Sequence, residues 1–485
     1  EKMSGFDAVS WTFGFRDHTG GYLTSEAFGF RINATGKSLK RKQIFTLETQ
    51  GSEAFIKTHL GRYLTFKADG KFLADAQSRG QEESLSIEPQ ADGRWALKTS
   101  RGYYIGGQGE ALDAYVKEIR PDRLWTVQLA IHPQVCIRNV NRKRYVHLVE
   151  NKLQVDEDIP WGSDAMITIH YVDGRYALQS DDGRFLSETS ELKARIDESC
   201  KFVLYFFQQQ VAFYSSSKKF LSAIGASGIL KATKEGPPTV DELFLFEDSQ
   251  PQFKLKSVSK GLFASVKSSI EVTCNQDTVT DNETFQFEID SATKKWSLRT
   301  CKSLFWGLQP DGAIHASVAP AKRGPNEFFE VQWHGPQLAL VAANGKFVTV
   351  KKNGALVANS AAVSPETLFT YEIINRPKLV LRGEHGFVGT LPSGFLECGR
   401  SDPEVYNMHV TAGKALISGA NGKYWKIGVN GVTVSGDEPD LFTLEFVEHS
   451  KVLIKAPNGN YLQGQQNGSF TATGKNADAS TLWEY

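Results

Sequence analysis

The sequence has few cysteines and no long apolar segment, and both absences restrict the class of protein. Its cysteines (Cys136, Cys200, Cys274, Cys301, Cys398) are odd in number and never form C-x-x-C, so neither a disulfide framework nor a zinc knuckle is predicted. No segment approaches the roughly 18 consecutive apolar residues of a membrane-spanning helix, and EKMSGFDAVSWTF at the start lacks a signal-peptide core. We therefore expect a protein of the reducing cytoplasm that does not insert into a membrane.

An excess of one charge is also missing. The chain of 485 residues carries 55 basic and 55 acidic side chains, which disfavours a uniformly basic nucleic-acid binder. We expect no nucleic-acid partner, and any charged partner must bind a local patch. The proportions of 40% hydrophobic and 23% charged residues are those of a soluble globular protein.

Sequence motifs of catalysis are absent as well. The chain contains no H-E-x-x-H and no G-x-S-x-G, and its histidines, cysteines and carboxylates form no metal-ligand cluster. The triplet Gly36-Lys37-Ser38 resembles the end of a phosphate-binding loop, but Arg31 stands where that loop requires a glycine. We therefore expect neither catalysis nor a cofactor or bound metal.

A short repeat runs through the whole chain. An aromatic residue is followed seven positions later by a glycine in Tyr22/Gly29, Tyr63/Gly70, Phe305/Gly312, Phe347/Gly354, Phe387/Gly394, Tyr424/Gly431 and Tyr461/Gly468, and one position further on in Phe220/Gly228. Weaker copies without the glycine lie around Tyr104, Tyr145, Phe185 and Phe263. Copies such as GKFVTVKKNGALVAN alternate apolar and polar residues on both sides of Asn-Gly or Asp-Gly, which predicts a β-hairpin. The period is about 40 residues, and no helical periodicity accompanies it.

A longer period groups these copies in threes. Leu124, Leu243, Leu368 and Leu482 recur in similar segments at intervals of 119, 125 and 114 residues. Three short repeats per long one are typical of a β-trefoil, whereas a single propeller of twelve blades would exceed the usual number. We therefore predict an all-β protein of four tandem β-trefoils with boundaries at 1–131, 132–250, 251–374 and 375–485. Because the linkers are short, we expect the units to pack into one compact rigid body.

The surface charge gives the main functional signal. Basic residues cluster at Lys37 to Lys42, Arg142 to Arg144, Lys351-Lys352 and Arg376 to Arg382. Any one cluster is also typical of a solubilising turn. Three of the four lie in or beside a predicted hairpin, however, and equivalent loops of a trefoil emerge on common faces. A neutral protein with such local patches can still attract an acidic partner.

Several irregular stretches resemble one known family. YLTSEAFGFRINATGKSLKRKQIFTLE, NRKRYVHL, NGKFVTVKKNGALVA, RGEHGFVG, TFQFEIDSATKKW and TGKNADASTLWEY are similar to segments of fascin, the actin-bundling family. The resemblance covers essentially the whole chain. It implies four β-trefoils that cross-link parallel actin filaments, as in filopodia, without catalysis or a cofactor. A protein that does this as a monomer needs at least two separate filament sites.

The resemblance also assigns roles to individual residues. Ser38 matches the regulatory protein kinase C phosphosite of the family, which makes that kinase an expected partner. The residues that it implies for actin binding are Lys40, Arg41, Lys42, Arg142, Lys143, Arg144, Lys351, Lys352, Arg382, Glu384 and His385. Gln463 departs from the family, which can carry a lysine linked to actin binding there, so that hairpin lacks this cation.

Two other functions remain open at this point. A carbohydrate-binding trefoil of the ricin type carries Q-x-W in its repeats, whereas here Gln332 and Trp333 are adjacent. A cytosolic scaffold that binds peptides or small molecules in trefoil clefts is the second alternative.

Overall fold

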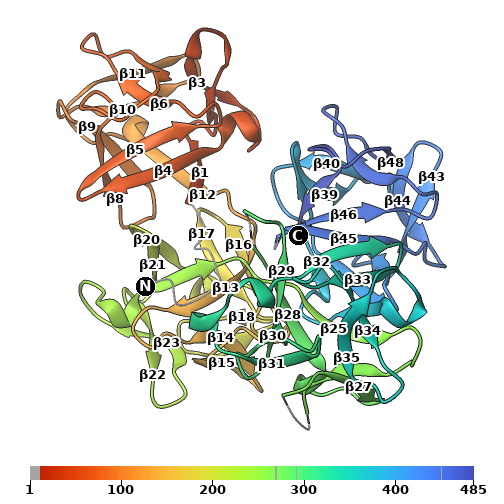
Figure 1. Cartoon of the computed structure of the whole chain (residues 1–485). Helices are drawn as coiled ribbons and strands as arrows, with labels where there is room; N and C mark the ends of the chain where they lie inside the picture. The colour runs from red at the N-terminus through yellow and green to blue at the C-terminus, as the bar shows by residue number, and fades with distance from the viewer. Residues whose placement is uncertain (1–10, 268–269, 291, 449) are drawn as a thin grey trace.

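The computed structural model describes residues 11–267, 270–290, 292–448 and 450–485 (Figure 1). Within these ranges the secondary structure consists of β-strands and short 3₁₀ turns, with no α-helix. In the same part of the chain, no helix is both long and apolar enough to cross a membrane. The prediction of an all-β protein of four tandem β-trefoils is confirmed.

The first unit contains a closed barrel of six strands and three hairpins. Its strands are β1 (Thr12–Arg16), β2 (Tyr22–Ser25), β3 (Ile32–Gly36), β4 (Phe45–Gln50), β5 (Glu53–Thr58), β6 (Tyr63–Phe66), β7 (Phe72–Ala76), β8 (Leu85–Pro89), β9 (Trp95–Thr99), β10 (Tyr104–Gln108), β11 (Ala111–Val116) and β12 (Leu124–Leu129). Antiparallel pairing runs β1–β4–β5–β8–β9–β12 and back to β1. The remaining strands form the hairpins β2–β3, β6–β7 and β10–β11, which is the β-trefoil arrangement.

The second and third units repeat this arrangement. The strands of the second are β13 (Gln134–Asn139), β14 (Tyr145–Val149), β15 (Lys152–Glu157), β16 (Ile167–Val172), β17 (Arg175–Gln179), β18 (Phe185–Leu186), β19 (Leu192–Lys193), β20 (Val203–Phe207), β21 (Gln210–Tyr214), β22 (Phe220–Ile224), β23 (Ile229–Lys234) and β24 (Phe244–Glu247). Those of the third are β25 (Gln252–Ser257), β26 (Phe263–Ser265), β27 (Thr273–Gln276), β28 (Thr284–Ile289), β29 (Trp296–Thr300), β30 (Phe305–Leu308), β31 (Ile314–Val318), β32 (Glu330–His334), β33 (Gln337–Val341), β34 (Phe347–Val350), β35 (Leu356–Ser360) and β36 (Leu368–Ile373). Single bridges, Tyr176 to Phe202 and Trp296 to Phe329, close the two barrels.

The fourth unit differs in its first barrel strand, which is interrupted. Its strands are β37 (Lys378–Leu379), β38 (Arg382–Gly383), β39 (Gly386–Thr390), β40 (Leu396–Arg400), β41 (Tyr406–Thr411), β42 (Lys414–Ser418), β43 (Tyr424–Gly428), β44 (Gly431–Gly436), β45 (Thr443–Glu448), β46 (Lys451–Lys455), β47 (Tyr461–Gly464), β48 (Phe470–Gly474) and β49 (Leu482–Glu484). β37 pairs with β41 and β38 pairs with β49, so the two short strands together close the barrel.

The repeated aromatic residue is the first residue of a hairpin in eleven of the twelve copies. In the remaining copy, Phe387 is the second residue of the hairpin. In eight copies a basic side chain of the neighbouring strand lies over the ring at 5.2 to 5.8 Å. These pairs are Arg16/Tyr22, Lys57/Tyr63, Lys98/Tyr104, Arg138/Tyr145, Lys256/Phe263, Arg299/Phe305, Arg382/Phe387 and Lys455/Tyr461. Such cation–π contacts stabilise the fold, so basic residues at this repeat position already have an internal partner.

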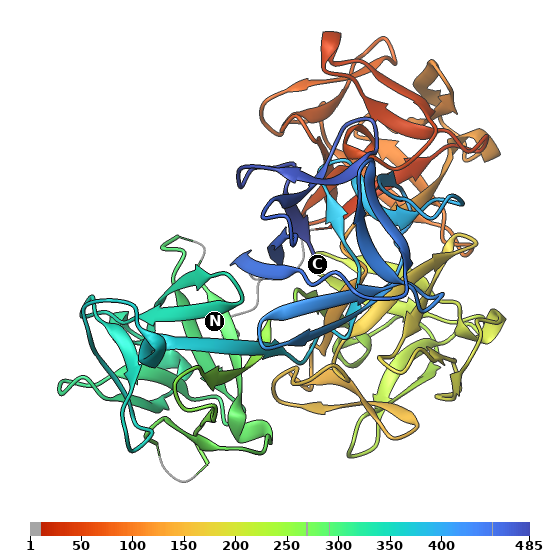
Figure 2. The same ribbon diagram turned by 90° about the vertical axis from the view of Figure 1, so that its right-hand side faces the viewer.

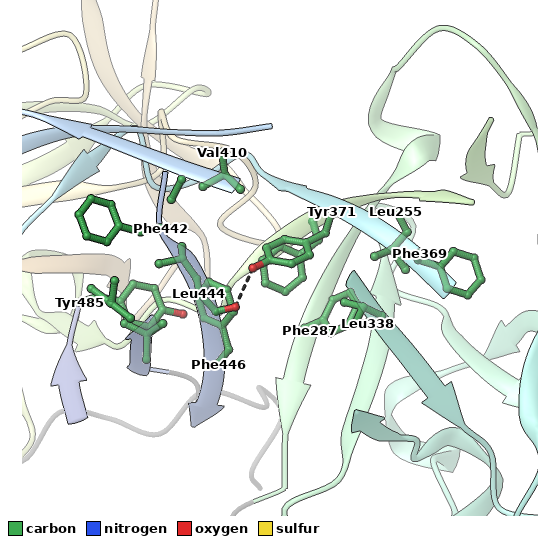
Figure 3. Packing of buried hydrophobic residues seen from close by; sticks show 14 of the residues in the cluster. Leu255, Phe287, Leu338, Phe369, Tyr371, Val410, Phe442, Leu444, Phe446 and Tyr485 are labelled. Atoms are coloured by element: carbon green, nitrogen blue, oxygen red, sulfur yellow. Dashed lines mark hydrogen bonds between the residues drawn. The ribbon is translucent and has the colours of Figure 1, made fainter. Parts of the chain in front are cut away.

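The units join in pairs through their hydrophobic cores. In the first pair, Phe206 of the second unit packs edge-on against Trp11 and Phe13 of the first, with ring centroids 4.9 and 5.0 Å apart. In the second pair, the buried Tyr371 hydroxyl donates to the Leu444 carbonyl at 2.7 Å (Figure 3). Burial of aromatic surface between units favours fixed relative positions.

Polar contacts join the two pairs near the linkers. The Gln252 amide of the third unit donates to the Pro160 carbonyl of the second at 2.8 Å. His132, buried just before β13, lies 3.1 Å from the Val380 carbonyl of the fourth unit. Burial lowers the pKa of His132 to about 4, so the imidazole is neutral at pH 7. All four units therefore meet in one assembly, which two views show (Figures 1 and 2).

Candidate functional site

Basic side chains line a cleft of about 720 Å³ between the first and fourth units. We call it the basic cleft; its lining residues are Lys37, Ser38, Lys40, Arg41, Lys42, Gln43, His59, Leu60, Glu384, His385 and Gln466. The structure thus brings the Lys40–Lys42 run of the first unit together with Glu384 and His385 of the fourth. The 3₁₀ turn Arg41–Gln43, which leads into β4, presents Arg41 and Lys42 to solvent.

Carboxylates offset part of the positive charge in and beside the cleft. Arg41 Nη1 lies 2.9 Å from Glu384 Oε1, and Lys42 Nζ lies 2.8 Å from Glu26 Oε2. The Arg41 and Lys42 side chains remain 62% and 53% exposed, so both can still reach a partner. Exposed ion pairs of this kind contribute little stability, about 0 to 1 kcal/mol.

Ser38 lies at the edge where the two units touch. Its side chain is half-buried, and the next residue, Leu39, is buried. The Leu39 amide donates to Ser401 Oγ of the fourth unit at 2.8 Å. A phosphate on Ser38 would therefore enter the basic cleft next to a contact between units.

His59 also lines this cleft, although no motif in the sequence indicates it. It follows β5, which pairs with β4 so that Thr58 lies opposite Phe45, and this pairing places His59 beside the end of the basic run. Burial, and then the charges of Arg41 and Lys42, lower the pKa of His59. His59 also lines an adjoining cavity of about 390 Å³ with a largely apolar wall that includes Leu39, Ile131 and Phe387.

The prediction that the residues from Arg376 to Arg382 form a basic cluster on the surface is wrong. Arg376 is buried, with 2% of its surface exposed, and its guanidinium lies 3.0 Å from Met166 Sδ. Arg382 is half-buried, donates to Glu484 Oε2 at 2.6 Å and to the Ala130 carbonyl at 2.5 Å, and covers the Phe387 ring. Docking of the fourth unit on the first two encloses these side chains, which a linear charge pattern cannot reveal.

The basic triplet before β14 divides into three different environments. Arg142 donates to the carbonyls of Ala223, Gly225 and Ala226, at 3.1, 2.6 and 3.1 Å, in the β22–β23 hairpin. Arg144 forms an ion pair with Asp158. Lys143 is exposed at a positive φ of 55°. Of the three, Lys143 is therefore the one best placed to meet a partner.

Acidic residues surround the next strand. His147 Nε2 lies 2.6 Å from Asp156, and its Nδ1 lies 3.6 Å from Asp164. Burial alone would lower the pKa of His147, but the hydrogen bonds with Asp164 and Asp156 outweigh this and raise it to about 9. The surface beside the triplet thus has mixed charge.

Lys351 and Lys352 form the simplest basic pair. Both are exposed in the β34–β35 turn, and the carbonyl of Lys352 accepts a hydrogen bond from Lys260 Nζ. No carboxylate in the described ranges forms an ion pair with either ammonium group.

In the fourth unit, Gln463 donates to Ser480 Oγ at 2.9 Å and accepts from Thr473 at 3.2 Å, so its amide serves the local fold.

The part of the chain that the structure describes contains no group of three side chains able to hold a metal ion. What the fold offers instead is basic surface on separate units of joined trefoils. The arrangement defines a protein of four joined β-trefoils that exposes basic side chains on several of its units.

Comparison with known proteins gives the family. A Fascin domain matches residues 19–127, 135–246, 259–371 and 388–485. Mouse Fascin-2 is 39% identical over 98% of this chain and 97% of its own length, and Fascin of Strongylocentrotus purpuratus is 34% identical over 98% and 99%. Mouse Fascin-3 is 26% identical over 98% and 96%. The chain belongs to the Fascin family, a family of structural actin-bundling proteins, and membership supports an actin-binding and bundling role.

Proposed function

We propose that this protein cross-links parallel actin filaments through basic sites carried on different trefoils. The observation that carries the proposal is the distribution of exposed cations: Lys40 to Lys42 in the basic cleft, Lys143 on the second unit, and Lys351 with Lys352 on the third. Actin filaments present acidic surface, so clustered cations supply steering and charge-assisted hydrogen bonds. Sites on different units can bind two filaments at once.

The joined cores support the mechanical part of the proposal. We infer that the trefoils, bounded near residues 131, 250 and 374, move little relative to one another, because aromatic contacts such as Trp11–Phe206 fill the space between them. A fixed distance between sites then sets the distance between filaments. Repetition along a bundle converts weak single contacts into strong overall attachment. The protein acts as a monomer of the cytoplasm, in actin-rich projections such as filopodia.

Not all predicted residues have the same role in this proposal. Arg41, with Lys40 and Lys42, faces the filament, as do Lys143 and Lys351–Lys352. Arg142, Arg144 and Arg382 have internal partners, so they position the surfaces around them. Glu384 and His385 shape the fourth-unit side of the basic cleft.

Phosphorylation of Ser38 is the regulatory step of the proposal. A phosphate adds about −1.5 to −2 charges beside Lys37, Lys40 and Arg41. That charge offsets the basic cleft and repels an acidic filament. Protein kinase C fits the basic residues that follow Ser38.

Electron microscopy of actin filaments mixed with the purified protein tests the proposal. We expect parallel bundles with a constant distance between filaments. Filaments that are coated but never joined, or that remain bare, would contradict it.

A further inference from the structure

The hairpin β2–β3 exposes an aromatic ring beside the basic cleft. Phe28, at its tip, is 87% exposed, the largest exposure of any aromatic residue among those the structure describes. Single exposed apolar residues are common on protein surfaces, so exposure alone carries little weight. The construction of the tip adds a second, independent observation.

The backbone of the tip that exposes Phe28 is strained. Gly29 and Phe30 both adopt left-handed conformations, with φ values of 68° and 50°. Glycine tolerates this region, but an aromatic residue such as Phe30 adopts it only at an energetic cost. Such strain persists where surrounding contacts maintain it, and it is concentrated at functional positions.

Those surrounding contacts are present. The Arg62 guanidinium lies 4.5 Å from the centre of the Phe30 ring and donates to the Asp75 carbonyl at 2.7 Å. The Glu26 amide donates to the Arg31 carbonyl at 2.9 Å and closes the loop. The exposed ring therefore stands on a fixed support, which reduces the entropy lost when a partner binds it.

Two contacts connect this tip to the turn that carries the cleft cations. Glu26 pairs with Lys42 at 2.8 Å, and the Gln43 amide donates to Thr24 at 3.1 Å. The ring and the cations thus belong to one surface. Protein interfaces commonly combine a buried aromatic anchor with charges at the rim, and the anchor supplies most of the binding energy.

We propose that Phe28 is the apolar anchor of the filament site at the basic cleft, inserting its ring into an apolar recess of the actin surface that is bordered by carboxylates. This inference rests on the proposed function. The cations steer the encounter, and Phe28 holds the complex.

The test compares Phe28→Ala with Phe28→Leu and a matched control, Val429→Ala. Val429 is fully exposed between β43 and β44, where the nearby Lys426 is already paired with Asp440 at 2.8 Å. Low-speed pelleting of actin filaments, at low and at physiological salt, gives the protein concentration needed for half-maximal bundling. We expect Phe28→Ala to raise it about tenfold at both salt concentrations, Phe28→Leu to raise it less, and Val429→Ala to leave it unchanged. The melting temperature should not change, because the ring is in water.

Bundling by Phe28→Ala within twofold of the parent protein would overturn the inference while leaving the proposed function intact. A parent protein that neither binds nor bundles filaments would overturn both. Pelleting with phosphatidylserine vesicles distinguishes a membrane contact from a filament contact. If Phe28→Ala lost binding to the vesicles but bundled filaments normally, the inference would also be overturned.

Discussion

Arg41 of the first trefoil and Glu384 of the fourth form an ion pair across the basic cleft, with Nη1 and Oε1 2.9 Å apart. The resemblance to fascin implied a filament-binding role for both residues, yet in the free protein they bind each other. Because the pair is largely exposed, it contributes little to stability. A filament carboxylate can therefore compete for Arg41.

Reversal of the charges of Arg41 and Glu384 distinguishes electrostatic steering from a direct contact between Arg41 and the filament. We expect Arg41→Glu to weaken bundling several-fold, since it removes a cation and places two carboxylates together. The double variant Arg41→Glu/Glu384→Arg restores net charge but moves the cation, so recovery should be partial and confined to low salt, where long-range attraction is strongest. Low-speed pelleting over a salt series measures this. Complete recovery at every salt concentration would mean that Arg41 only maintains the pair.

A negative charge at Ser38 should weaken bundling. Ser38→Asp adds one charge, so we expect a smaller loss than stoichiometric phosphorylation, which adds about −1.5 to −2. Both losses should decrease as salt rises, because screening reduces the repulsion. Ser38→Ala is the control and should bundle normally. Equal losses at all salt concentrations would point instead to disruption of the nearby Leu39–Ser401 hydrogen bond.

The fold could be predicted from the sequence because each hairpin carries its own local signal. The aromatic residue and the glycine after it located most of the hairpins, since a tight turn requires a positive φ. Two copies without that glycine still turn, because Glu150 and Ser190 adopt positive φ values of 52° and 76°. Their aromatic residues, Tyr145 and Phe185, retained enough of the pattern to be recognised.

The candidate site was less accessible to prediction. Whether an arginine is free to bind a partner depends on contacts that are distant in sequence. Arg376 is enclosed by the second and fourth units, and Arg142 bonds to a hairpin of its own unit about 80 residues away. The pairing of β5 with β4 places His59 beside the basic run, but the cleft that it lines also needs Glu384 and His385 of the fourth unit. Periodicity along a chain contains no information on such contacts between units.

The basic triplet should separate into structural and binding residues. Arg142→Ala frees three carbonyls of the β22–β23 hairpin, and we expect it to lower the free energy of unfolding by about 1 to 2 kcal/mol. Lys143→Glu should leave stability unchanged but reduce bundling, because the side chain is exposed. Urea unfolding and low-speed pelleting provide the two measurements, with Lys143→Gln as a milder control. If Lys143→Glu lowered stability without reducing bundling, and Arg142→Ala reduced bundling without lowering stability, Lys143 would be removed from the proposed sites.

The bond from Tyr371 to Leu444 tests how firmly the third and fourth units are joined. Tyr371→Phe keeps the buried ring but leaves the Leu444 carbonyl without its donor. We expect a loss of about 1 to 2 kcal/mol in the free energy of unfolding, measured in urea, and bundles with a less regular filament distance. Tyr461→Phe is a control within a single unit, since its hydroxyl donates to Glu445 on a neighbouring strand at 2.9 Å. Unchanged stability for Tyr371→Phe would show that this bond does not help to fix the units.

His147 gives the protein a pH-dependent contribution to stability. Hydrogen bonds with Asp164 and Asp156 raise its folded pKa to about 9, whereas the unfolded pKa is about 6.5. The stabilisation is therefore complete below about pH 6.5 and is lost as the pH rises towards 9. Because both carboxylates are nearly half exposed, solvent screening limits it to about 1 to 2 kcal/mol. Urea unfolding at pH 6 and pH 9 should show this loss in the parent protein, and His147→Gln should remove most of it. A parent and variant with the same pH dependence would mean that the imidazole is neutral in the folded protein and that its contacts with the two aspartates are not ion pairs.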